Sequence, residues 1–225
     1  MWHWRPAVAV AAAVALALTG CSREIEGVAQ PDPRQAGVAL TSDGFGIVAG
    51  FADAPLQLEI FTEPQCPHCA HLQATFGEEI KAHMQSGELA VTYRPMTFLD
   101  YEYEIDYSAI VDNALFLAVE PSTSAEVFQT FVEDLWANQD LSFIDYADKD
   151  FADLARDSGL SDEIVTRIAD GDSAVDTDEM GLGNEDLLSE QSPESPGTPV
   201  VYNLKEKDTV DISDADWLDK LLRTT

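Results

Sequence analysis

The sequence predicts an α/β domain with a helical segment inserted into it. An apolar strand over residues 56–61 runs into a segment of helical character, 68–86, and a second strand follows at 89–96. Apolar residues then recur at helical spacing through much of 105–190, and strand character returns only at 198–203. A strand–helix–strand unit of this length places its strands parallel in one sheet, and a long helical insertion is tolerated where the flanking strands meet again.

The shorter elements fit around this frame. Residues 38–40 and 45–48, on either side of a Ser-Asp-Gly turn, predict a short opening hairpin. Ser161 is a plausible N-cap for one helix of the insertion, and the stretch after Leu188, rich in Pro and Ser, is typical of a loop. A strand at 209–211 and a final helix that begins at Asp214 or Asp216 complete the chain.

The N-terminal 20 residues are typical of an export signal and are set aside from the fold. One positive charge, Arg5, precedes an apolar run over 6–18 that is too short to span a bilayer alone. Leu18-Thr19-Gly20-Cys21 then resembles the lipobox of bacterial lipoproteins, which predicts lipidation at Cys21. The alternative is an ordinary secretory peptide with an incidental cysteine. Residues 21–36 have no periodicity and are predicted to be a tether.

The chemistry of the chain centres on Cys66-Pro67-His68-Cys69, at the start of the helix after the first long strand. Two thiols three residues apart on the first turn lie about 5 Å apart at Cα, a separation that a disulfide bridges. The unpaired N–H groups and partial positive charge of a helix start favour a thiolate at Cys66. With Cys21 lipidated, these cysteines form one isolated pair whose short loop would stabilise the fold little. The pattern therefore indicates a redox-active dithiol.

Other uses of the cysteines fit less well. A zinc site needs two further ligands, and only scattered histidines such as His71 and His83 are available. Covalent haem attachment needs a histidine directly after the second cysteine, where this chain has Ala70. We therefore expect no cofactor and no metal.

The charge of the chain excludes several partners. The 225 residues carry a net charge of −30, and removal of residues 1–20 takes away one basic residue, which leaves about −31. This balance argues against nucleic-acid binding and against binding of anionic lipid by a polybasic segment. Membrane attachment is therefore expected through acyl chains alone. Solubility or adaptation to salt explains the charge, with selection of cationic clients as the sharper alternative.

Three features together resemble the DsbA family, in particular the exported or lipid-anchored thiol–disulfide oxidoreductases of Gram-positive bacteria. They are the entry Phe-Thr-Glu-Pro-Gln before the Cys-Pro-His-Cys motif, the position of the helical insertion, and Gly197-Thr198-Pro199. The resemblance spans residues 37–223. It implies a thioredoxin-like fold with an inserted helical subdomain: an N-terminal part at 37–104, the insertion at 105–190 and a C-terminal part at 191–225.

The resemblance also implies roles for residues. Cys66 would be the attacking thiolate and Cys69 the buried resolving thiol. Pro199, in a cis peptide bond, would let a client peptide add beside it as a strand. Thr198 and Pro67, next to the sulfurs, would tune potential and client release. The buried acid that many thioredoxin folds place below the motif is either Glu59 or absent.

The surroundings of Cys66 decide its charge. His68 is expected to support the thiolate with its side chain, against the alternative of a solvent-facing ring. Glu63 is the one acid near enough to oppose the thiolate. Three tyrosines in a predicted acidic loop could line the edge of a client groove, although ordinary packing or surface exposure is favoured: Tyr101, Tyr103 and Tyr107.

The sequence therefore predicts a lipid-anchored, extracytoplasmic and monomeric oxidase that introduces disulfides into exported proteins. The family resemblance implies that a membrane redox partner reoxidises it. Two alternatives remain open at this point: a reductase or isomerase with the opposite electron flow, and a non-catalytic client- or metal-binding lipoprotein.

Overall fold

The computed structural model describes residue 1 and residues 35–139, 146–194 and 197–225. The predicted signal peptide, Cys21 and nearly all of the tether therefore lie outside the described residues. The first half of the fold contains β1 (Gly37–Leu40), β2 (Ile47–Gly50), β3 (Leu56–Thr62), α1 (Pro67–Ser86), β4 (Leu89–Pro95), α2 (Phe98–Tyr103) and α3 (Tyr107–Leu117). The second half contains α4 (Ala125–Ala137), α5 (Asp148–Asp157), α6 (Asp162–Ala169), α7 (Thr177–Gln191), β5 (Val200–Asn203), β6 (Asp208–Thr209) and α8 (Trp217–Leu222).

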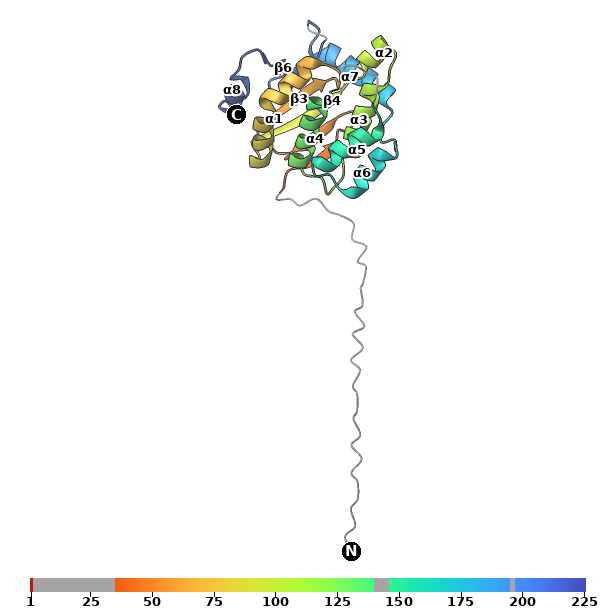
Figure 1. Cartoon of the computed structure of the whole chain (residues 1–225). Helices are drawn as coiled ribbons and strands as arrows, with labels where there is room; N and C mark the ends of the chain where they lie inside the picture. Colours follow the sequence, from red (N-terminus) through yellow and green to blue (C-terminus); the bar gives the residue numbers. More distant parts are fainter. Residues whose placement is uncertain (2–34, 140–145, 195–196) are drawn as a thin grey trace.

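The strands form one mixed sheet in the order β1-β2-β4-β3-β5-β6. Its central strands β3 and β4 are labelled in Figure 1. β3 and β4 run parallel with Leu56 opposite Leu89, and the other neighbouring pairs are antiparallel. β5, which follows the helical insertion, pairs with β3, so the two ends of the interrupted domain meet at the centre of the sheet. The predicted α/β fold with a helical insertion is confirmed.

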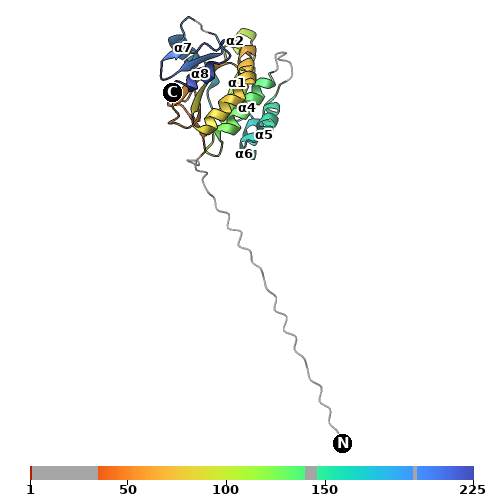
Figure 2. The same ribbon diagram turned by 90° about the vertical axis from the view of Figure 1, so that its left-hand side faces the viewer.

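The two faces of the sheet are covered by different helices (Figures 1 and 2). α1 and α4 lie side by side over one face, where Leu58 and Ile60 of β3 join the main core. Because side chains alternate along a strand, Glu59 and Phe61 face the other side. There Phe61 packs in a small cluster with Leu188 of α7, which closes that face.

The ends of several elements differ from the predictions. The first helix after β4 begins at Phe98, so Tyr101 and Tyr103 lie on helix α2 and not in a loop. Both are about half exposed, at 56% and 51%, whereas Tyr107 is buried in the core. The predicted strand at 209–211 is shorter, because β6 ends at Thr209. Asp211 accepts hydrogen bonds from the backbone and side chain of Ser213, a local turn that competes with strand pairing.

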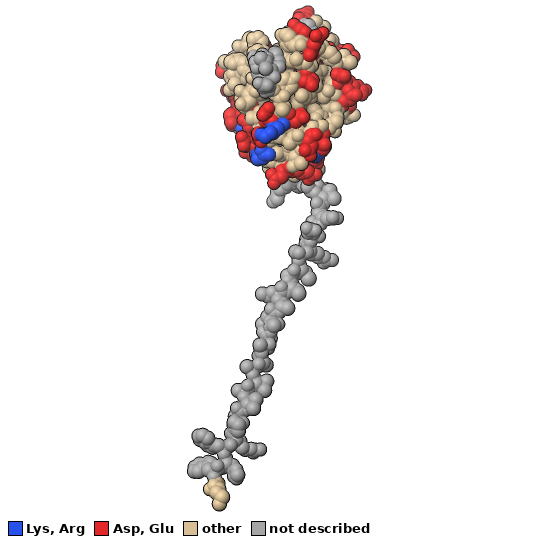
Figure 3. Space-filling model, turned by 45° about the vertical axis from the view of Figure 1, so that its right-hand side comes forward, with Lys and Arg blue, Asp and Glu red and all other residues tan. Residues whose placement is uncertain are grey.

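Acidic side chains dominate the surface. Figure 3 shows them spread over the visible face, with only a few basic side chains among them. Several of the basic groups are paired with carboxylates; Arg156, for example, lies 2.6 Å from Asp153. Across the described ranges, no helix is both long and apolar enough to cross a membrane.

Candidate active site

The fold places the two cysteines at the first turn of α1. β3 ends at Thr62, and Cys66 is the N-cap of the helix with extended backbone angles (φ −77°, ψ 116°). Pro67 occupies the first helical position, where its missing N–H costs no hydrogen bond. The Cys66 carbonyl accepts from the N–H groups of Cys69 (3.1 Å) and Ala70 (3.2 Å). Both cysteines are free thiols in this structure, so it shows the reduced dithiol.

The surroundings of the Cys66 sulfur favour its anion. A hydrogen bond from the Cys69 thiol is the largest contribution, and Thr198 and the backbone N–H groups of Cys69 and His68 add to it. Burial opposes them, but together they lower the pKa of Cys66 to about 5. A thiol with this pKa is almost fully ionised at neutral pH, and a low pKa is the property that a thiol needs to act as a nucleophile and as a good leaving group.

Cys69 has the opposite environment. Its side chain is 1% exposed, against 7% for Cys66. Burial and the neighbouring Cys66 sulfur raise the pKa of Cys69 above its usual value. A buried thiol that keeps its proton can donate a hydrogen bond to the thiolate beside it. The two thiols therefore differ: Cys66 is charged and keeps a small exposed area, whereas Cys69 is neutral and almost fully covered.

The loop before β5 closes over the dithiol from the opposite side of the fold. β5 is antiparallel to β3, with Val200 opposite Phe61, and this pairing brings residue 198 to the start of α1. The Sγ atom of Cys66 lies 3.3 Å from the carbonyl oxygen of Thr198. The Thr198–Pro199 peptide bond is cis.

His68 acts on Cys66 through a different group from the one predicted. Its side chain is exposed, and no hydrogen bond from the imidazole to Cys66 is found in the described structure. Its backbone N–H is one of the groups that lower the pKa of Cys66. The expected support from the imidazole is therefore replaced by support from the helix start itself.

Glu63 lies in the loop between β3 and the dithiol, and its side chain is completely buried. One carboxyl oxygen accepts from the Gln65 backbone N–H (2.7 Å), and the other is hydrogen-bonded to the Ser108 hydroxyl. Burial raises the pKa of Glu63 to about 8, with the charges of Asp100 and Cys66 acting in the same direction. At neutral pH this acid is mostly neutral. The charges of Glu63 and Cys66 act against each other, as predicted, but below about pH 8 Glu63 is mostly protonated, and its opposition to the thiolate is then small.

Glu63 belongs to a buried polar cluster that the sequence analysis missed. The Gln65 amide donates to Asp100 (2.6 Å) and to Ser108 (2.8 Å), and Asp100 accepts from the backbone at the start of α3. Asp112, one turn beyond Ser108 on α3, is fully buried, and neither carboxyl oxygen has a partner in the described part of the chain. Burial raises the pKa values of both Asp100 and Asp112. The signal in the sequence was polar Ser108 and Asp112 four residues apart on an apolar helix.

Glu59, the predicted acid below the motif, has a different setting. It is buried on the α7 side of the sheet, and Arg94 of β4 donates to it at 2.6 Å. The Gln191 amide donates to its other oxygen at 2.8 Å, and Arg94 also reaches Asp43 at 2.8 Å. This acid ties β3 to β4 and α7 as part of an ion pair. Of these two acids, Glu63 is the one whose titration is coupled to the charge of Cys66.

Gln139, directly after α4, is a second contact that was not predicted. Its amide donates to the carbonyl oxygens of Pro64 (2.6 Å) and Cys66 (3.0 Å). The helical insertion therefore holds the loop before the dithiol at two places, at Glu63 through α3 and at Cys66 through the end of α4. His71 and His83 are not part of this arrangement; His83 pairs with Glu88 at 2.8 Å, at the far end of α1.

The comparison with protein families agrees with this geometry. The model of a family described as Thioredoxin matches residues 42–180, more than half of the chain. The chain belongs to this family. The match covers the dithiol and most of the helical insertion.

Solved structures of similar shape carry the same fold. MdbA, a thiol-disulfide oxidoreductase from Corynebacterium diphtheriae, has a TM-score of 0.68 at 24% identity, over 88% of this chain and 96% of that one. MdbA from Corynebacterium matruchotii gives 0.69 at 24% identity, over 82% and 92%. Reduced DsbA from Mycobacterium tuberculosis gives 0.59 at 16% identity, over 84% and 91%. The predicted DsbA-like thioredoxin fold is confirmed.

A curated relative is of a different kind. The serine/threonine-protein kinase PknE of Mycobacterium tuberculosis is 25% identical over 181 residues, which is 79% of this chain. The chain spans about a third of that kinase, 31% of its length.

Proposed function

We propose that this protein is a thiol–disulfide oxidoreductase that introduces disulfides into exported proteins outside the cytoplasm. The observation that carries the proposal is the contrast between the two sulfurs: Cys66 is held as an anion at the helix start, whereas Cys69 is buried and protonated. A stabilised thiolate stabilises the reduced form, which makes the disulfide form an oxidant. The DsbA-like fold, shared with oxidoreductases of known structure, supports the same class of reaction.

The reaction would begin from the Cys66–Cys69 disulfide. A client thiolate attacks the Cys66 sulfur, the bond to Cys69 breaks, and Cys69 leaves and takes up a proton. A second client thiolate then attacks the client's sulfur in the mixed disulfide and releases Cys66 as the thiolate. The client loses two electrons and forms its disulfide, and the protein gains them as the reduced dithiol seen in this structure.

The loop at Thr198 and Pro199 would hold the client during this exchange. It lies against Cys66, with the Thr198 carbonyl 3.3 Å from the sulfur. An extended client segment beside the loop would add as a further strand next to the reacting sulfur. Reoxidation requires an external disulfide or quinone-linked oxidant at the membrane, the partner implied by the family resemblance.

Equilibration with glutathione buffers tests the direction of electron flow. We expect a reduction potential nearer to the value of about −120 mV for the oxidising members of this class than to about −270 mV for thioredoxin. A potential below about −230 mV would make the protein a reductase or isomerase.

Trapping tests whether the dithiol reacts with clients at all. The Cys69→Ala variant, expressed with its signal peptide, should accumulate mixed disulfides through Cys66, and the Cys66→Ala variant should accumulate none. Absence of trapped partners from both variants would favour a non-catalytic binding lipoprotein.

The location is tested separately, because Cys21 lies outside the described residues. If Cys21 is the lipidated residue, the wild-type protein incorporates labelled palmitate and the Cys21→Ala variant does not. If neither the wild-type protein nor the variant were labelled and the protein were found in the medium, the N-terminus would be an ordinary secretory peptide.

A further inference from the structure

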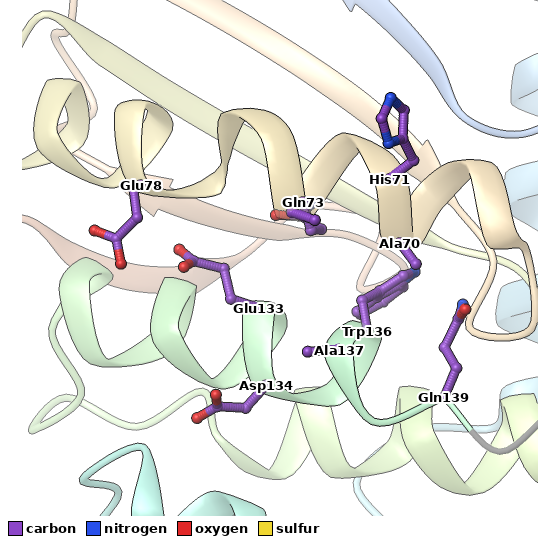
Figure 4. Close-up of a pocket in the computed structure, with 10 residues that line it drawn as sticks. Ala70, His71, Gln73, Glu78, Glu133, Asp134, Trp136, Ala137 and Gln139 are labelled. Atoms are coloured by element: carbon purple, nitrogen blue, oxygen red, sulfur yellow. The ribbon is translucent and has the colours of Figure 1, made fainter.

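A groove of about 570 Å³ runs along the junction of α1 and α4, beside the dithiol (Figure 4). Its near end is formed by Ala70 and Gln139, and its far end by Glu78 and Glu133. The volume is within the range of about 300–1,000 Å³ that is usual for ligand sites. The residues predicted from the sequence to bind clients, Thr198 and Pro199, do not line it.

The near end of the groove is joined directly to the active site. Ala70 is the residue after Cys69, and its N–H donates to the Cys66 carbonyl at 3.2 Å. Gln139 donates to the same carbonyl at 3.0 Å. The near end of this groove therefore lies within one helical turn of Cys66, next to any client chain that is bound to Cys66 through a disulfide.

The far end of the groove is acidic. Glu78 of α1 and Glu133 of α4 face each other across it in Figure 4. Lys81 lies 2.9 Å from Glu78 and 3.5 Å from Glu133 and balances one of the two charges. Asp134, which also lines the groove, points away from α1 and accepts from Ser158 at 2.7 Å. The groups at this end together keep a net negative charge, so a cationic side chain is the complementary ligand.

Two features of the groove walls bear on an occupant: Gly77 makes room for an acid, and Trp136 offers a buried donor. Gly77 lies in the middle of α1, where glycine costs about 1 kcal/mol relative to alanine. A Cβ atom there would lie 2.7 Å from Cγ of Glu133, so glycine makes room for this carboxylate at the wall. Trp136 lines the groove next to Ala70, and its buried indole N–H has no acceptor within the described ranges. The carbonyl of a bound peptide would supply one.

We propose that this groove binds the client chain next to its reacting cysteine and favours clients with Lys or Arg about four to six residues from that cysteine. The proposal rests on the proposed function. The distance follows from geometry: from Cys66 to Glu78 the helix rises about 18 Å, which an extended peptide spans in about five residues. The net charge of −30 would attract such clients from a distance, and the groove would determine at which position of the client a cationic residue is favoured.

The test uses two matched client peptides, each with two cysteines. One peptide carries Arg five residues before the first cysteine and five residues after the second, and the other carries Gln at both positions. The second-order rate constant for their oxidation by the disulfide form is measured at 0.15 M salt, where screening acts beyond about 8 Å. We expect the Arg peptide to react about two- to fivefold faster, the size of one partly exposed ion pair. In the Glu78→Gln/Glu133→Gln variant the two peptides should react at about the same rate, and the rate constant for the Gln peptide should equal that of the wild-type protein.

The control variant is Glu102→Gln/Glu126→Gln, which loses the same charge at exposed positions on α2 and α4 outside the groove. It should keep the full preference for the Arg peptide. An equal loss of preference in both double variants, or no preference in the wild-type protein, would overturn the proposal, because the bulk charge would then explain any effect.

A binding measurement separates this proposal from the proposed function. The same peptides with serine in place of cysteine should bind the wild-type protein with the same preference for Arg, measured by fluorescence anisotropy. This preference should also disappear in the groove variant. Failure of the protein to oxidise dithiothreitol would contradict the proposed function, whereas equal affinity for the two serine peptides would contradict the groove.

Discussion

The molecule buries two glutamates within four residues of each other, and the fold treats them in opposite ways. Glu59, on the α7 face of the sheet, is 3% exposed and contacts the guanidinium of Arg94 at 2.6 Å. Glu63, in the loop before the dithiol, is completely buried next to the acids of α2 and α3, and no described residue supplies a cation to it. The first carboxylate is compensated by charge, and the second is compensated by a proton.

This difference separates a structural acid from one that is coupled to the chemistry. An ion pair between buried groups ties together the strands that carry it, and removal of one partner leaves an uncompensated charge in the interior. A buried acid without a cation changes its charge near neutral pH, and Glu63 does so close enough to Cys66 for the two charges to interact. The neutral state of Glu63 at pH 7 allows the thiolate of Cys66 to form beside it.

Removal of the cation should have the largest effect. We expect Arg94→Met to lower the free energy of unfolding by about 3–5 kcal/mol, because it leaves Glu59 charged and unpaired in the interior. Urea denaturation followed by circular dichroism measures this loss.

Two variants make this result specific. The double variant Glu59→Gln/Arg94→Met should regain much of the stability, and Arg156→Met, which removes a surface pair with Asp153, should cost less than about 1 kcal/mol. A loss at Arg94 no larger than the loss at Arg156 would show that Glu59 does not depend on its cation.

The Glu63→Gln variant should change how stability depends on pH. The folded state holds the Glu63 proton up to about pH 8, whereas the unfolded state releases it near pH 4.5. The folded form is therefore the more protonated one in this window, and stability falls as pH rises, by up to about 1.4 kcal/mol per pH unit. Glutamine removes this contribution.

The measurement is best made on the disulfide form, in which Cys66 cannot titrate. In the reduced form the lowered pKa of Cys66 acts with the opposite sign, since the folded thiolate gains stability between about pH 5 and 9. The difference between wild type and Glu63→Gln should change steadily from pH 4.5 to 8 and then level off. If the free energies of unfolding of the two proteins ran parallel over this pH range, Glu63 would already be ionised in the folded protein.

Sequence reasoning found the parts of the site that are local in the chain. The start of α1, the two cysteines and the strand before them follow from spacing and turn chemistry within a dozen residues. The contacts that set the charges come from far away in the sequence: Thr198 lies 132 residues from Cys66 and Ser108 lies 45 from Glu63. Burial of Glu63 by α3 largely removes its expected effect on Cys66 at neutral pH, and nothing near Glu63 in the sequence indicates that burial.

The smallest expected effect concerns Cys66 itself. Because Glu63 is neutral at the pH where Cys66 titrates, Glu63→Gln should move the Cys66 titration midpoint by less than about half a unit. Alkylation rates measured across pH in both proteins give this shift. A fall of a full unit or more in the variant would show that Glu63 carries a charge near pH 5.

The titration of the reduced wild-type protein tests the whole account most directly. Thiolate absorbance near 240 nm, recorded from pH 3 to 10 with Cys66→Ser as the reference, should show one thiolate that appears with a midpoint of about 5. A midpoint near 8.5, the value of an unperturbed cysteine, would contradict the claim that this fold holds Cys66 as an anion.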